Sequence, residues 1–188
     1  MADSPHGDKQ SPRDGFGRDY LTATEGANMV TLVTGATGLV GNNVVRLLVE
    51  NDYRVRVLVR PRSNLKSLEG LPVELVRGDV CEPGAVAQAC REVDRVIHCA
   101  AEVHIGWRGL KRQRAINVDG TRNVAEAATA VGARMVHVSS IDALGVSNGI
   151  PADENTQPQE EVLCPYVITK REAEQVVLDR VARGLDAV

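Results

Sequence analysis

The sequence predicts an α/β protein built on a doubly wound parallel sheet with helices on both faces. From Val30 onward, short β-branched runs alternate with helical stretches, as in sheets whose parallel strands are connected by helices. The runs are nearly continuous in apolar residues, Val55 to Val59 being one example, which indicates burial on both faces. A glycine-rich turn follows the first run. At 188 residues the chain is long enough for one sizeable core.

The order of the elements follows from this alternation. Residues 1–28 are rich in Gly, Pro, Ser, Asp and Arg without periodicity, so we expect a disordered tail before a folded domain over residues 29–188. The predicted strands are Val30–Thr34, Arg54–Val59, Val73–Arg77, Val93–Cys99 and Arg134–Ser139. The predicted helices lie near residues 39–50, 64–69, 83–90, 108–131 and 165–183. Residues 184–188 are expected to enter a sixth strand.

Charge and composition exclude several classes of partner. The net charge of −3 provides no basic field for nucleic acid. No apolar stretch approaches the roughly 20 residues that cross a bilayer, and the N-terminus lacks the pattern of a secretory signal, so we expect no membrane partner and a cytoplasmic location. The four cysteines and four histidines form no metal-ligand pattern, which favours buried, reduced thiols and no metal.

The turn after the first strand carries three glycines, Gly35, Gly38 and Gly41, and leads directly into an amphipathic helix. Such a turn lets the backbone approach a pyrophosphate, while the helix N-terminus offers free N–H groups, as in Rossmann-type folds. The alternative is that the glycines only punctuate a loop, but strand, motif and helix occur in the required order. The predicted dinucleotide contacts in this turn are Gly35, Thr37, Gly38, Leu39, Val40 and Gly41.

The residues after the second and third strands bear on the choice of cofactor. NAD is usually held by an acidic residue at the end of the second strand, where this chain has Arg60, followed by Pro61 and Arg62. A guanidinium pairs with the 2′-phosphate of NADP, so NADP(H) is favoured and NAD(H) is the alternative. Solvated loop cations are the other interpretation of Arg60 and Arg62. Asp79, beside Val80, is placed to bond the adenine or, alternatively, to cap the next helix.

Two further segments carry candidate catalytic groups. Tyr166 and Lys170 are four residues apart, which places them on one face of a helix. A nearby ammonium stabilises a phenolate, so the spacing favours Tyr166 as proton donor or acceptor. Ser139 and Ser140 end a buried strand at the carboxyl edge of the sheet, where such folds bind ligands. His98 and Cys99 end another buried strand, and we interpret them as packing and backbone-positioning residues.

The order of these motifs resembles the extended short-chain dehydrogenases, and among them the NAD-dependent epimerase/dehydratase branch with dihydroflavonol-reductase-like, 3β-hydroxysteroid-dehydrogenase-like and hopanoid-associated sugar epimerase members. The resemblance covers residues 29–188. It is carried by the glycine turn, Gly78-Asp79-Val80, His98-Cys99-Ala100-Ala101, Asn117-Val118-Asp119-Gly120-Thr121, the Ser139-Ser140 strand end and Tyr166-x-x-x-Lys170.

The resemblance implies roles for individual residues. Ala100 and Ala101 would line the channel between ribose and nicotinamide, and Asn117 would be a catalytic residue at the helix position near the active site. Ser140, five residues before Gly145, would be the catalytic hydroxyl. Tyr166 would exchange the proton, and Lys170 would hold the ribose.

Two functional hypotheses remain open. One is an enzyme that transfers hydride between NAD(P)(H) and a hydroxyl or carbonyl carbon of a sugar-nucleotide, sterol-like or flavonoid-like small molecule. The other is an inactive NADP-binding module, because members of the branch continue beyond this point into a smaller substrate domain, so we interpret the chain as truncated. A strand left at an open edge also favours self-association, so a homodimer is the protein partner to consider.

Overall fold

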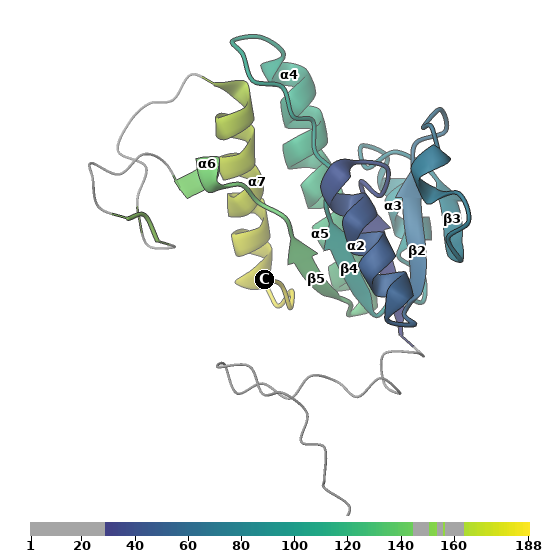
Figure 1. The fold of residues 1–188 in the computed structure, drawn as a ribbon. Coiled ribbons are helices and arrows are strands. Elements are labelled where there is room, and N and C mark those ends of the chain that lie inside the picture. Colours follow the sequence, from purple (N-terminus) through teal and green to yellow (C-terminus); the bar gives the residue numbers. More distant parts are fainter. Residues whose placement is uncertain (1–28, 145–150, 154–155, 157–163) are drawn as a thin grey trace, which may run out of the picture.

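The computed structural model describes residues 29–144, 151–153, 156 and 164–188. Within them, parallel strands form one sheet in the order β3-β2-β1-β4-β5 (Figure 1). The strands are β1 (Val30–Thr34), β2 (Arg54–Val59), β3 (Val73–Arg77), β4 (Arg95–His98) and β5 (Arg134–His137). The chain moves outward from β1 to β3 and then crosses back to β4, so the strand order reverses between β1 and β4. This confirms the predicted fold class.

Helices connect the strands. They are α2 (Leu39–Glu50), the 3₁₀ turn η1 (Lys66–Leu68), α3 (Pro83–Ala89), α4 (Leu110–Gln113), the π-helical segment η2 (Arg114–Asp119), α5 (Gly120–Val131), α6 (Ile141–Leu144) and α7 (Pro165–Val181). None of the helices in this described part is long and apolar enough to span a membrane.

Three helical segments differ from the sequence prediction. The helix expected at 64–69 is only η1, where the Asn64 side chain accepts from the Lys66 N–H and thereby competes with helical bonding. The helix expected from residue 108 begins at Leu110, since Gly109 has a left-handed φ of 87°, and it contains the π-helical segment. The short helix α6 occupies a region where we predicted none.

Both faces of the sheet are covered. On one face, Val33 and Val57 pack with Val45 of α2. On the other face, Leu32 and Met135 belong to a core cluster to which α3, α5 and α7 contribute, their members including Val86, Val124 and Val177. Because successive strand residues point to opposite faces, one apolar strand such as β1 supplies both cores.

The two edge strands depart from the expectation of burial on both faces. The residues of β3 are exposed or half-buried, and β2 is the one strand of the described residues that pairs with it. In β5, Val136 is 38% exposed. The strands expected to reach Cys99 and Ser139 end at His98 and His137.

The last residues of the chain lie beside β5, at the position of a sixth strand. Met135 and Ala187 form a parallel bridge. The Met135 N–H donates to the Asp186 carbonyl at 2.8 Å, and the His137 N–H donates to the Val188 carbonyl at 2.8 Å. The backbone of β5 is therefore partly paired on its outer side, and the expected entry into a further strand is present.

The four cysteines are free thiols, and they differ in burial. Cys90 is buried, as expected, whereas Cys81 is exposed. Burial is still the largest influence on the Cys81 thiol, and with the carboxylate of Asp79 it raises the pKa of Cys81 to about 11. This thiol is therefore protonated at neutral pH.

Candidate cofactor and active site

The glycine turn after β1 is shaped by close backbone approach. Gly35 has a left-handed φ of 70°, and a Cβ there would lie 2.7 Å from the backbone nitrogen of Ala100. A Cβ on Gly41 would lie 2.4 Å from the carbonyl oxygen of Gly35. Only glycine fits at either position, because the opposing atoms are backbone and cannot move aside. Gly35 thus brings the β1 turn against the segment after β4, and Gly41 seats α2 on the turn.

The N-terminus of α2 is open toward solvent. Gly38 is its N-cap, with no side-chain cap and no acidic residue in the first turn. Leu39 and Val40 follow with exposed side chains, which the first turn of a buried helix would not have. The first backbone N–H groups of α2 are therefore available to an anion, and the helix dipole favours one.

One cleft brings together most of the residues predicted to bind a dinucleotide. It lies at the carboxyl ends of the strands, where the strand order reverses. Of the predicted residues, its lining includes Gly35, Thr37, Gly38, Arg60, Asp79, Val80, Ala100 and Ala101. Leu39, Val40, Gly41, Tyr166 and Lys170 do not line it. Residues that the sequence reasoning missed include Ser63, Cys99, Glu102 and Ile116.

The loop after β2 forms a basic end to this cleft. Arg60 is exposed, and Arg60 to Ser63 line a second hollow next to it. The Arg77 side chain donates to the carbonyls of Arg60 and Pro61, at 3.3 Å each, which holds a further guanidinium beside the loop. Among the described residues, no carboxylate pairs with Arg60 or Arg62. The loop therefore has unneutralised positive charge to offer a phosphate.

Asp79 lies at the end of the cleft after β3. Its carboxylate accepts from the Cys81 N–H at 3.0 Å, which closes a turn. The N-cap of α3 is Glu82, so the alternative interpretation of Asp79 as the cap of that helix is wrong. Asp79 and the following Val80 both line the cleft.

Tyr166 and Lys170 lie on the first turns of α7, which begins with Pro165 at its N-terminus. Lys170 is only 3% exposed, and its Nζ donates to the carbonyl oxygen of Val138 at 2.7 Å. Burial lowers the pKa of Lys170, while the charge of Glu174 opposes that shift. The ammonium is thus held at the end of β5 in a partly desolvated position.

The two serines after β5 have different surroundings. The Ser140 hydroxyl donates to the Asp142 carboxylate at 3.1 Å and accepts from the Asp142 N–H at 3.3 Å. The Ser139 hydroxyl is buried without a hydrogen-bond partner in the described part of the chain. Gly145, on which the choice of Ser140 over Ser139 depends, lies outside the described residues.

Asn117 lies in η2 with 2% of its surface exposed. Its Oδ1 accepts from the Glu102 N–H at 2.7 Å, and its Nδ2 donates to the Glu102 carbonyl at 3.1 Å and to the Thr169 hydroxyl at 3.0 Å. Both amide hydrogens are therefore engaged. Asn117 fastens the segment after β4 to α7 at the residue before Lys170, so its geometry suits a positioning role better than the predicted catalytic one.

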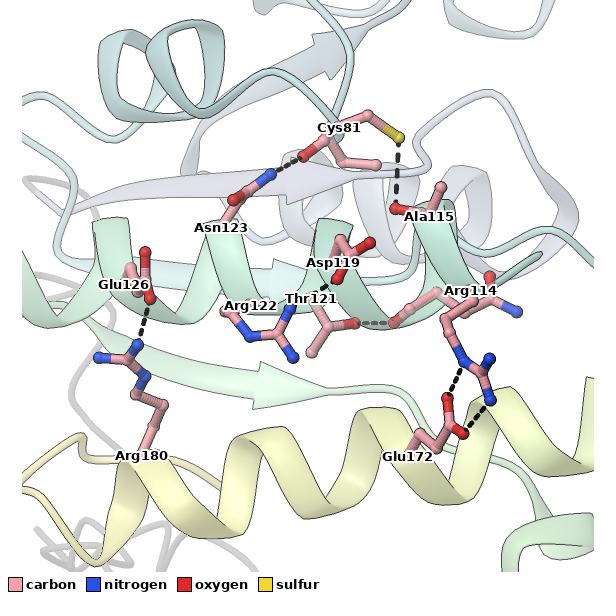
Figure 2. Close-up of polar contacts among 12 residues, drawn as sticks. Cys81, Arg114, Ala115, Asp119, Thr121, Arg122, Asn123, Glu126, Glu172 and Arg180 are labelled. Atoms are coloured by element: carbon pink, nitrogen blue, oxygen red, sulfur yellow. Dashed lines mark hydrogen bonds and ion pairs between the residues drawn. The ribbon is translucent and has the colours of Figure 1, made fainter. Parts of the chain in front are cut away.

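Ion pairs hold α7 against the helix that contains η2 and α5. Figure 2 shows Arg114 bonded to Glu172 through two nitrogens, at 2.7 and 2.5 Å, and Arg180 bonded to Glu126. A two-pronged guanidinium–carboxylate pair fixes orientation as well as distance. In the same figure Asn123 bonds the segment after β3, through the Val80 carbonyl at 2.9 Å. The helix thus connects the cleft to α7.

Comparison with known proteins agrees with this geometry. The profile of the NAD-dependent epimerase/dehydratase family matches residues 31–188. The chain belongs to this family.

Individual family members and their relatives support the same assignment. The sterol demethylase protein B of Methylococcus capsulatus is 37% identical over 84% of the chain and 49% of its own length. A putative dihydroflavonol 4-reductase of Synechocystis is 38% identical over 83% of the chain and 46% of its own length. The chain therefore spans about half the length of these relatives.

Solved structures show the same fold. The crystal structure of gox2253 superposes with a TM-score of 0.77 and 39% identity, covering 85% of this chain and 50% of that one. A short-chain dehydrogenase/reductase superfamily protein from Agrobacterium tumefaciens with bound NAD has a TM-score of 0.70 and 30% identity, covering 84% of this chain and 46% of that one. The resemblance inferred from the motif order is thus confirmed at the level of the family.

Proposed function

We propose that the protein is an NAD(P)-dependent oxidoreductase or epimerase that acts at a hydroxyl or carbonyl carbon of a small molecule, and that it prefers NADP(H). The observation that carries the cofactor preference is the exposed Arg60 after β2, which pairs with none of the described carboxylates and has Arg62 and Arg77 beside it. The 2′-phosphate of NADP would occupy this end of the cleft. The NAD bound in the Agrobacterium structure is the reason to keep NAD(H) as the alternative.

The remaining contacts follow the direction of the cleft. The pyrophosphate would lie against the N-terminus of α2 at Gly38, the adenine near Asp79, and the nicotinamide ribose beyond Ala100 and Ala101. The nicotinamide supplies the hydride acceptor or donor when it is bound. The close backbone approach at Gly35 supports this placement, since it brings the glycine turn against Ala100, which lines the same cleft.

Three side chains would handle the proton and the substrate oxygen. Tyr166 would give or take the proton, and Ser140 would orient the oxygen. Lys170 would hold the cofactor ribose, since its Nζ lies at the end of β5. Asn117 would keep α7 in register with the segment after β4.

Among the substrate classes considered, an apolar ring compound fits better than a sugar nucleotide. Val103, Ile105 and Trp107 alternate along the segment after β4, with exposed fractions of 67%, 70% and 80%. The backbone of Gly106 in this segment is among the groups that lower the pKa of the Cys164 thiol, so the segment lies near the start of α7, where Tyr166 is. Relatives named for a sterol and for a dihydroflavonol support the same class. Because the chain spans half their length, this proposal concerns the whole protein.

The cofactor preference is tested by replacing Arg60. In Arg60→Ala we expect NADPH binding to weaken by about tenfold or more and NADH binding to change little, because a charge-assisted pair contributes roughly 1.5–3 kcal/mol. Arg54→Ala is the matched control, since Arg54 is an exposed arginine at the opposite end of the same strand. Calorimetric titration of the 188-residue chain with each cofactor measures both affinities. Equal affinity of the wild-type chain for NADPH and NADH, or equal losses in Arg60→Ala, would overturn the preference.

A further inference from the structure

His98, the last residue of β4, connects the cofactor cleft to η2. The imidazole is 1% exposed, and both ring nitrogens have partners. Nδ1 lies 2.7 Å from the Thr34 hydroxyl at the end of β1, and Nε2 lies 3.0 Å from the Thr121 hydroxyl of α5. Thr34 and His98 are paired in the register of β1 and β4, so the contact is built into the sheet.

The donors in this set can be assigned one by one. The Thr121 hydroxyl gives its proton to the carbonyl oxygen of Asn117 at 2.6 Å, a bond drawn in Figure 2. Its oxygen can then only accept from His98, which places the imidazole proton on Nε2. Nδ1 of the neutral ring is therefore an acceptor, and it takes the proton of the Thr34 hydroxyl. The Thr34 oxygen in turn accepts from the Ala100 N–H at 3.3 Å.

The surroundings keep the ring neutral. Burial is the main cause that lowers the pKa of His98 well below its ordinary value; His137, when protonated, and the ammonium of Lys170 act in the same direction. An imidazolium would donate from both ring nitrogens. The Thr121 oxygen could still accept from Nε2, but the Thr34 hydroxyl would have to turn its proton away from Nδ1. The directed set of bonds thus requires the neutral form.

This series of hydrogen bonds ends at Ala100 on one side and at Asn117 on the other, and both residues lie next to proposed functional groups. Ala100 lines the cleft after β4. Asn117 belongs to η2, and its amide bonds both the backbone of Glu102 and the hydroxyl of Thr169, one residue before Lys170. The helix leaves α-helical geometry here, since the Gly120 N–H bonds to the Ala115 carbonyl five residues earlier. Such π-helical turns often occur at functional sites.

We propose that His98 is a positioning residue: as a neutral imidazole with its proton on Nε2, it holds the Ala100 N–H through Thr34 and the Asn117 carbonyl through Thr121. It thereby fixes the distance between the cofactor cleft and the turn of α7 that carries Lys170. The expected effect on cofactor affinity rests on the proposed dinucleotide site. The expected tautomer of His98 and the ordering of the backbone at Ala100 and Glu102 do not depend on that site.

The test compares two threonines of the same helix. Thr121 and Thr129 both donate to the carbonyl four residues earlier, but only Thr121 contacts His98. In Thr121→Val, we expect the ¹⁵N shifts of His98 to leave the pure Nε2–H pattern and the Glu102 and Ala100 amides to exchange hydrogen at least tenfold faster. NADPH affinity should fall by about tenfold. Thr129→Val should leave the His98 ¹⁵N shifts, the exchange of these amides and the NADPH affinity unchanged.

The outcomes separate this proposal from the proposed function. An Nδ1–H or charged His98 in the wild-type chain at pH 7, or amide exchange in Thr121→Val equal to that in Thr129→Val, would overturn the positioning role. A wild-type chain that binds neither NADPH nor NADH, while its His98 shows the Nε2–H pattern and the amides respond as expected, would contradict the cofactor site and leave the role of His98 supported.

Discussion

At the scale of single residues, Lys170 shows the tension between stability and function. Its ammonium is nearly buried, and a carbonyl at 2.7 Å is its hydrogen-bond acceptor in the described part of the chain. Desolvating a charge costs free energy that a single neutral acceptor only partly offsets. A lysine retained in such a position indicates a requirement other than folding, and the proposed ribose contact supplies one.

We therefore expect Lys170→Met to separate the two properties. The free energy of unfolding should stay within about 1 kcal/mol of wild type or increase, because methionine fills similar space without a charge. NADPH affinity should fall by about tenfold or more, as for loss of a charge-assisted bond. Urea unfolding and calorimetric titration measure the two quantities, with exposed Lys111→Met as control. A large loss of stability with unchanged affinity would make Lys170 a structural residue.

At the scale of elements, β5 contains a histidine that makes folding sensitive to acid. Both ring nitrogens of His137 are buried without a hydrogen-bond partner among the described residues, and the ring stacks on His98 with centroids 5.6 Å apart. Burial, and then the charge of Lys170, lowers the pKa of His137 from 6.5 to about 4. The unfolded chain therefore binds a proton between these two values, and the folded chain does not.

The sign of the pH effect follows from this difference. The stabilisation by neutral His137 is complete above pH 6.5 and is lost as the pH falls toward about 4. Between pH 7 and pH 5 we expect a loss on the order of 1–2 kcal/mol from this residue. In His137→Phe, which keeps the ring and removes the titration, the loss should be smaller by that amount, with unchanged or higher stability at pH 7. Urea unfolding at both pH values measures the difference, and identical pH slopes in the two proteins would contradict the account.

An element could be predicted from the sequence where short-range sequence patterns determine it, and not where contacts between distant residues do. The pattern of Val30–Thr34, the glycines after it and the helix over 39–50 are local signals, and the structure has them at the predicted residues. The π-helical segment at Asn117 could not be predicted, because no local pattern marks it and the Asn117 side chain bonds Glu102 and Thr169, which lie in other parts of the fold. The exposure of Val136 likewise depends on what covers β5, which a strand pattern does not record.

The candidate site was predictable to a similar degree. Gly35, Arg60 and Asp79 were predicted from their positions after strands, and Ala100 from the family resemblance. The parallel sheet brings them to one cleft because such strands end at the same edge. The bonds of His98 to Thr34 and Thr121 could not be anticipated from spacing. Both partners are ordinary threonines whose side chains reach the imidazole only in the folded sheet.

At the scale of the whole molecule, the central claim is that NADP(H) binds at the carboxyl ends of β1 and β4, where the strand order reverses. The glycine turn, the open end of α2, the basic loop after β2 and the family membership all support it.

The most direct measurement is a two-dimensional amide NMR titration of the 188-residue chain with NADPH. We predict saturable shifts concentrated at the cleft and at the start of α2, namely at Gly35, Gly38, Leu39, Arg60, Asp79, Val80, Ala100 and Ala101. The amides of Glu50 and Arg54, at the opposite end of the same elements, should not move. Absence of any shift at millimolar NADPH and NADH, or shifts confined to residues away from this edge, would contradict the central claim.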